Sequence, residues 1–165
     1  MARCNRQVQA SPSVLDLLLD DGPCGGEDRD PFDLRQQKRC VARDLEALLN
    51  ARCCALDVRL LEGFPQSRSS LLTYGIADLS SLSLLNPDHR MLLRNQIRSA
   101  IERFEPRLSQ VRVNLDVPRE FSRMLRFRVE ALLEVHPHRP PVTFDAMLRL
   151  SSCACQVRSQ DEGPW

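Results

Sequence analysis

The sequence predicts an α+β fold, a small antiparallel meander of three to four strands covered by two main helices. Two stretches, residues 31–52 and 86–104, repeat apolar side chains at helical spacing. After them, residues 111–117, 125–135 and 144–150 alternate apolar and polar side chains, as half-buried strands do, and a short fourth strand is expected to end at Val157. The short connections favour antiparallel neighbours. We therefore expect one domain over residues 31–158, with a flexible tail before it (1–30) and a disordered tail after it (159–165).

The N-terminal tail is expected to carry one short apolar helix. A serine can cap it, and Leu15, Leu18 and Leu19 then lie on one side. A helix this short is marginal on its own in water. Residues 10–30 hold six acidic residues and one arginine, a net charge of −5 that the total of +1 conceals. Leu15 and Leu18 therefore either fold back onto the domain or bind a partner.

The first long helix is predicted to begin at Asp30 and Pro31 and to end at about Arg52. An N-cap residue followed by proline is a common helix start, because proline lacks an N–H that would be unpaired there. The apolar positions that share helical spacing are Leu34, Val41, Leu45 and Leu48. A serine-containing loop is expected next, then a single turn at Leu71–Tyr74 that Gly75 ends, and mostly extended or irregular chain up to the second helix.

The second long helix, residues 86–104, has the clearest signals in the chain. It begins with an asparagine N-cap and a proline at the first helical position. Pro106 disfavours helical geometry at the residue before it, so the helix is expected to end at about Phe104. Glu105, Pro106 and Arg107 then form a stiff corner that joins this helix to the first strand and presents two opposite charges.

Common catalytic and cofactor motifs are missing from the sequence. The six glycines form neither GxGxxG nor GxxxxGK[ST], and no GxSxG occurs. Seven cysteines without a CxxC pair argue for reduced thiols that act as small apolar fillers. A metal ion bound by Cys53, Cys54, Cys153 and Cys155 with His136 and His138 is the alternative, although vicinal and CxC pairs lack the usual zinc spacing. We expect no cofactor and no metal.

Two carboxylates near the end of the second helix, Glu102 and Glu105, are candidates for acid–base chemistry such as glycoside cleavage. Glu102 lies four residues after Arg98, and Glu105 lies two before Arg107, so ion pairs explain both more simply. Arg98 also continues a stripe of arginines, from positions 90 and 94, that is either a solvated face or a docking surface. We predict no catalytic residue, with a peptidoglycan hydrolase that uses Glu102 or Glu105 as the alternative.

The basic residues are almost all arginine, since Lys38 is the one lysine. Arginine suits phosphate or carboxylate pairs, but here it alternates with acids, and aromatic residues make up only 5% of the chain. Proteins that bind single-stranded nucleic acid combine a basic groove with aromatic platforms, which makes such a binder a weak alternative. No apolar run reaches the roughly 18 residues of a membrane span, and the chain starts without a signal-peptide pattern, so a cytoplasmic protein is expected.

Several segments together resemble the TssE family of bacterial type VI secretion systems, which is similar to a wedge protein of contractile phage baseplates. They are PSVLDLL, RDLEALLNAR, YGIADLS, RFEPRL, VRVNL, LRFRVEALLEV and PVTFDAMLRL. The resemblance covers roughly Pro12 to Val157, in the order that the family shows. The chain departs from the family pattern at Cys153 and Cys155, where glycine and an aromatic residue are common.

The resemblance implies a small baseplate subunit with no established catalytic role, cytoplasmic and located at the baseplate docked on the inner-membrane complex. The implied partners are the baseplate proteins TssF, TssG and TssK and the TssB–TssC sheath, with no nucleic acid and no membrane insertion. An exposed sheet edge would accept or donate a strand, a natural way to start a sheath whose subunits exchange strands.

In the family, the Glu-Pro-Arg corner is linked to the contact with the wedge core. The residues expected to bind partners here are Glu105, Pro106, Arg107, Arg98, Glu102, Leu15 and Leu18. An internal Glu105–Arg107 pair that only locks the helix to the sheet is the alternative, and both interpretations stay open.

Overall fold

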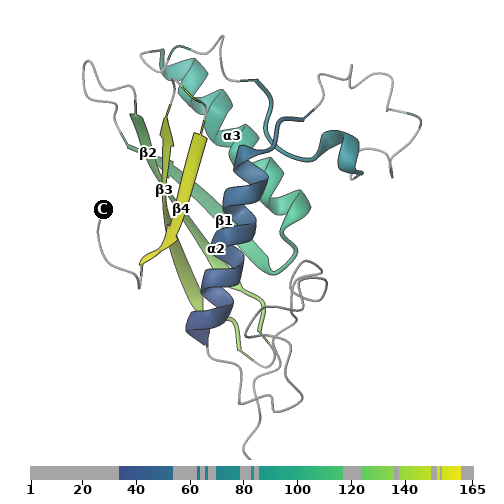
Figure 1. Ribbon diagram of the computed structural model, residues 1–165, viewed down its shortest axis with the longest axis vertical. Coiled ribbons are helices and arrows are strands. Elements are labelled where there is room, and N and C mark those ends of the chain that lie inside the picture. The colour runs from purple at the N-terminus through teal and green to yellow at the C-terminus, as the bar shows by residue number, and fades with distance from the viewer. Residues whose placement is uncertain are drawn as a thin grey trace, which may run out of the picture.

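The helix after Asn86 begins and ends where the sequence predicts. In a computed structural model, α3 spans Pro87–Phe104, and the side-chain oxygen of Asn86 accepts a hydrogen bond of 2.9 Å from the N–H of Asp88 (Figure 1). The structure describes residues 34–53, 63, 66, 70–78, 83, 86–116, 124–135, 138–149, 152 and 154–160. None of the helices within these ranges is long and apolar enough to cross a membrane.

The first long helix is confirmed as α2, Leu34–Asn50. Its buried face consists of Gln37, Val41, Ala42, Leu45, Leu48 and Leu49. The predicted start at Asp30 and Pro31 lies outside the described residues, as do the apolar segment with Leu15 and Leu18 and residues 161–165. The helix ends slightly before the predicted Arg52, because Arg52 instead forms a parallel bridge with Ile76.

Gly75 makes that bridge possible. The turn predicted at Leu71–Tyr74 is the short 3₁₀ helix η3, Leu71–Thr73, and Gly75 follows it with φ 103°. A side chain is strained in this conformation, and a Cβ on Gly75 would lie 2.6 Å from the carbonyl carbon of Ala51. Ile76 then donates its N–H to Ala51 O at 3.1 Å, so the chain after α2 and the chain before α3 lie side by side.

The predicted meander is confirmed as one four-stranded antiparallel sheet in the order β1-β2-β3-β4. The strands are β1 (Leu108–Leu115), β2 (Met124–Leu133), β3 (Pro141–Arg149) and β4 (Ala154–Ser159). Burial alternates along them, so one face is apolar and packs against the helices. Figure 1 shows α2 crossing the sheet beside β4.

Several strand boundaries differ from the prediction: β2 ends at Leu133 and not at Val135, and β3 begins at Pro141 and not at Phe144. β1 begins at Leu108 instead of Val111, because the pairing with β2 shifts between Ser109 and Arg112, and Gln110 takes φ 53° there. This bulge interrupts the period-two pattern on which the prediction relied. β4 continues to Ser159, beyond the predicted end at Val157.

Cys155 is part of the apolar core. Its side chain is 2% exposed and packs with the buried residues of the sheet. Burial, and to a lesser degree the charge of Glu46, raises the pKa of the Cys155 thiol to about 12. The thiol is therefore a neutral apolar filler, and β4 forms although Cys155 departs from the family pattern.

Candidate partner-binding corner and sheet edges

Glu105 ends α3 with its side chain turned into the protein. Its N–H donates to Ile101 O at 2.9 Å, and its carbonyl accepts from Leu108 N–H at 3.1 Å. Only 4% of the residue is exposed. Pro106 is exposed at the tip of the corner. A carboxylate this deeply buried requires a cation close by.

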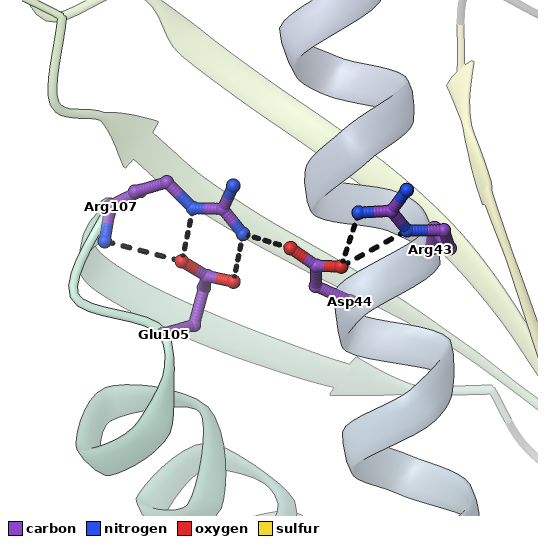
Figure 2. A network of polar contacts seen from close by, with 4 residues as sticks. All are labelled: Arg43, Asp44, Glu105 and Arg107. Atoms are coloured by element: carbon purple, nitrogen blue, oxygen red, sulfur yellow. Dashed lines mark hydrogen bonds and ion pairs between the residues drawn. The ribbon is translucent and has the colours of Figure 1, made fainter. Parts of the chain in front are cut away.

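Arg107 supplies that cation in a bidentate pair (Figure 2). Its Nε donates to Glu105 Oε1 and its Nη2 to Glu105 Oε2, both at 2.6 Å. The Arg107 N–H also donates to Glu105 Oε1, at 3.3 Å. Two parallel hydrogen bonds fix the plane of the guanidinium relative to the carboxylate. The predicted Glu105–Arg107 pair is thus present, and it lies within the chain.

Asp44 of α2 is a third member, which the sequence prediction missed. Arg107 Nη2 also donates to Asp44 Oδ2 at 2.6 Å. The other Asp44 oxygen, Oδ1, accepts from Arg43 Nη2 at 3.0 Å and from Arg43 Nε at 3.2 Å (Figure 2). We call Arg43, Asp44, Glu105 and Arg107 the corner cluster. It ties α2 to the junction of α3 and β1.

The carboxylates of the corner cluster keep the Arg107 guanidinium protonated. Burial alone would lower the pKa of Arg107, but the hydrogen bond and charge of Glu105, and then those of Asp44, raise it above its ordinary value. Tyr74 lies beside the cluster, and its ring meets Phe104 edge-on at 5.1 Å. Burial, Asp44 and Glu105 raise the pKa of the Tyr74 hydroxyl, which therefore stays protonated at neutral pH.

The remaining predicted site residues lie apart from this cluster. Arg98 and Glu102 form the predicted i, i+4 ion pair, with Nε and Oε1 2.8 Å apart, on an exposed face of α3. Leu15 and Leu18 fall outside the described residues. Among the residues that the structure does describe, no group of three or more histidine, cysteine, aspartate or glutamate side chains is arranged to bind a metal.

The two edges of the sheet differ in how their backbone groups are satisfied. At β4, Cys155 N–H donates to Asn50 Oδ1 at 2.8 Å, and Asn50 Nδ2 donates back to Cys155 O at 2.9 Å. One turn earlier on α2, Glu46 Oε2 accepts from Val157 N–H at 2.9 Å. Two side chains of α2 therefore cap the backbone groups of β4 that a further strand would use.

The β1 edge has no such cap. Asp116 N–H donates to Arg126 O, so in an antiparallel ladder Asn114 also bonds inward to β2, whereas Val113 and Leu115 face outward. Within the described ranges, the outward N–H and C=O groups of Val113 and Leu115 make no hydrogen bond. A partner strand has free donors and acceptors here, whereas at β4 three of the outward groups are already bonded to α2.

Comparison with known proteins identifies the family of this chain. No curated protein matches the chain. The family model described as baseplate wedge protein gp25 matches residues 35–138, which is more than half of the chain and includes α2, the corner cluster and β2. The chain therefore belongs to the baseplate wedge protein gp25 family, whose members are structural components of baseplates.

Proposed function

We propose that this protein is a TssE subunit of a type VI secretion baseplate, which joins the wedge proteins TssF, TssG and TssK and helps to start the TssB–TssC sheath. It acts in the cytoplasm, at the baseplate docked on the inner-membrane complex, without cofactor, metal or nucleic acid. Membership of the baseplate wedge family supports a structural role with other baseplate proteins as partners. The asymmetry of the two sheet edges is the observation that carries the sheath assignment.

The open β1 edge supports a strand contact with the sheath. Strand addition uses unpaired N–H and C=O groups in a row, which Val113 and Leu115 provide. Burial of Val113, at 5% exposure, fixes the side chains of this strand against the core, so an incoming strand meets a rigid template. At the β4 edge, the N–H and C=O of Cys155 and the N–H of Val157 are already bonded to α2.

The corner supports a contact with the wedge. Pro106 is exposed, Arg107 is partly exposed, and both are held on a stiff turn by the buried Glu105 carboxylate. The Arg98–Glu102 pair and the segment with Leu15 and Leu18 remain further candidates for partner contact. A rigid corner with an exposed tip suits a partner interface, because little conformational freedom is lost when a partner binds.

A peptidoglycan hydrolase is the competing function. Glycoside cleavage needs one carboxyl that is protonated and a second that flanks the same bond. Glu105 accepts a bidentate hydrogen bond from Arg107, and Glu102 accepts from Arg98, so each carboxylate is already neutralised by a neighbouring cation. These pairs favour the structural role.

Co-purification tests the proposal directly. Tagged wild-type protein, co-expressed with TssF and TssG, is expected to elute with both at a fixed ratio in size-exclusion chromatography. A wild-type protein that stays apart from a TssF–TssG assembly that otherwise forms would refute the wedge role. Sustained cleavage of purified peptidoglycan that disappears in a Glu105→Gln variant would instead favour the hydrolase.

A further inference from the structure

Two large apolar side chains are exposed next to each other near the start of α3. Met91 is 51% exposed and Leu92 is 48% exposed. Leu93, the next residue, is 1% exposed and belongs to the core, so the core-facing side of the helix is already covered. Single exposed apolar residues are common on protein surfaces, but two adjacent ones form a small patch. This outer face of α3 is open to another segment.

A stripe of arginines borders the patch. Arg90, Arg94 and Arg98 follow one another at i, i+4 spacing, about 6 Å apart along the helix. Arg98 pairs with Glu102. Within the described residues, the side chains of Arg90 and Arg94 make no hydrogen bond or ion pair. Arg94 lies three positions after Met91 and so on the same side of the helix, which suits an occupant with an apolar side beside an acidic one.

The predicted N-terminal helix has this composition. Leu15, Leu18 and Leu19 form its apolar side. Asp16 and Asp20 lie four positions apart beside those leucines, so their carboxylates repeat at the same spacing as the two guanidinium groups. The net charge of −5 around this helix is complementary to an arginine stripe, which favours contact with the outer face of α3.

The chain between the predicted helix and α2 is long enough for this contact. Twelve residues, 22–33, separate Asp21 from Leu34, where α2 begins. In Figure 1, α2 begins at the lower end of the domain and α3 begins at the upper end. Twelve extended residues span roughly 40 Å, which exceeds the roughly 25 Å length of α2. The segment therefore reaches α3 of its own chain.

We propose that residues 13–21 dock as a short helix on the outer face of α3 in the same chain, with the leucines on Met91 and Leu92 and the two aspartates on the two arginines. A helix of this length is marginal alone in water, and docking supplies the burial that it lacks. In the free protein the contact covers two surfaces at once, the leucines and the α3 face. A partner that binds either surface displaces the segment.

Hydrogen exchange of the full-length protein, measured by mass spectrometry, tests the contact. Docking is expected to slow exchange in residues 13–21 at least about tenfold relative to an unstructured peptide. Arg90→Glu combined with Arg94→Glu is expected to abolish this protection, because both aspartates then face carboxylates. The control, Arg126→Glu combined with Arg149→Glu, makes the same charge change on the helix-free face of the sheet and is expected to alter protection less than about twofold.

Reversal of the two aspartates separates a specific pairing from general attraction. Asp16→Arg combined with Asp20→Arg lies outside the folded domain and is expected to lose the protection without changing thermal unfolding. Combined with the two α3 reversals, it is expected to regain the protection. Protection that persists in either reversal alone, or that the combined variant does not regain, overturns the proposal.

A second pair of variants tests the apolar half of the contact. Met91→Ser combined with Leu92→Ser is expected to lose the protection of residues 13–21. Leu71→Ser removes a leucine that is 85% exposed on η3 and is expected to keep it. Circular dichroism checks that these variants fold, and the aspartate reversals decide the question if they do not. Equal protection in both serine variants contradicts the proposed site.

Dilution identifies which chain supplies the segment. Docking within one chain gives the same protection at every protein concentration, whereas a segment from a second copy loses protection on dilution. Loss on dilution overturns the proposal, and so does a wild-type segment that exchanges as fast as an unstructured peptide. These measurements use the protein without its partners, so their outcome is independent of whether the wedge role holds.

Discussion

At the corner, one guanidinium neutralises carboxylates from two distant parts of the chain. The spacing of Glu105 and Arg107 predicted their pairing, because two residues on either side of a proline corner are within reach in any fold. Asp44 lies 63 positions from Arg107, and no local pattern predicts that contact. The burial of Glu105, which is 4% exposed, could not be predicted either, since the local sequence shows only an ordinary charged residue.

The first prediction concerns the stability of the corner. Arg107→Ala leaves Glu105, 4% exposed, without its cation, so the free energy of unfolding is expected to fall by about 3–5 kcal/mol. Arg98→Ala removes a solvent-exposed ion pair with Glu102 and is expected to cost less than about 1 kcal/mol. Urea denaturation of both variants checks the difference. Equal losses would show that Glu105 is solvated more freely than the structure indicates.

A second residue-scale prediction concerns Gly75. Gly75→Ala forces a side chain into positive φ and against the Ala51 carbonyl, so a loss of at least about 2 kcal/mol is expected. Gly63→Ala is the matched control, because nothing lies within 4 Å of a Cβ placed there. Thermal unfolding of the two variants should differ by several degrees, and a Gly75→Ala protein as stable as Gly63→Ala would contradict this account.

At the level of elements, the helices and the strand order could be predicted, but the sheet edges could not. Caps, prolines and periodicity are local, which is why α3 was placed at Pro87–Phe104. The bulge at Gln110 hid the start of β1, since it breaks the alternation. The β4 cap depends on two side chains of α2 meeting a strand more than 100 residues later. A polar pair, Glu46 and Asn50, spaced one turn apart on a buried helix was the only local sign.

The β4 cap should limit self-association. Asn50→Ala leaves the N–H and C=O of Cys155 without their partners, so we expect a loss of about 1–3 kcal/mol and concentration-dependent aggregation. Ala47→Ser, on an exposed position of the same helix, is the control. Light scattering across a concentration series measures the effect. If Asn50→Ala stays monomeric at concentrations where β4 edges would meet, the capping role is wrong.

The β1 edge should be blocked by proline at an outward position. The Leu115 N–H makes no hydrogen bond in the ladder, so Leu115→Pro is expected to leave the sheet intact and to block strand addition. At Asn114, where the N–H bonds inward to β2, proline is expected to destabilise the domain by about 3 kcal/mol or more. Fluorescent TssB–TssC sheaths counted in cells check the outcome. Normal sheath numbers with Leu115→Pro would exclude the β1 edge as the starting point.

For the whole molecule, overall charge and composition predicted little about stability. A buried ionisable group, by contrast, makes the free energy of unfolding depend on pH. The pKa of Cys155 rises from 9.0 to about 12 when the chain folds, so the neutral thiol is favoured in the folded state. Its contribution to stability is complete below pH 9, where the thiol is neutral in both states. As the pH rises from 9 towards 12, only the unfolded thiol ionises, and this contribution is lost.

Alkaline pH should therefore destabilise the wild-type protein more than a Cys155→Ala variant. Between pH 8 and about pH 10.5, the wild-type protein is expected to lose about 2 kcal/mol more than the variant. Urea denaturation at both pH values under reducing conditions gives the comparison. The absolute stability of the variant is lower because of the cavity, so the test is the difference in pH slope, and parallel slopes would contradict the burial of this thiol.

The hydrogen bonds between α2 and β4 would also determine in which direction the proposed assembly grows. A sheet open at both edges can be inserted anywhere in a polymer of strands, including between copies of itself. Here α2 already binds backbone groups at the β4 edge, so a chain that adds a strand at β1 would occupy the terminal position of such a polymer. The proposed growth from β1 would then have a fixed origin and a single polarity.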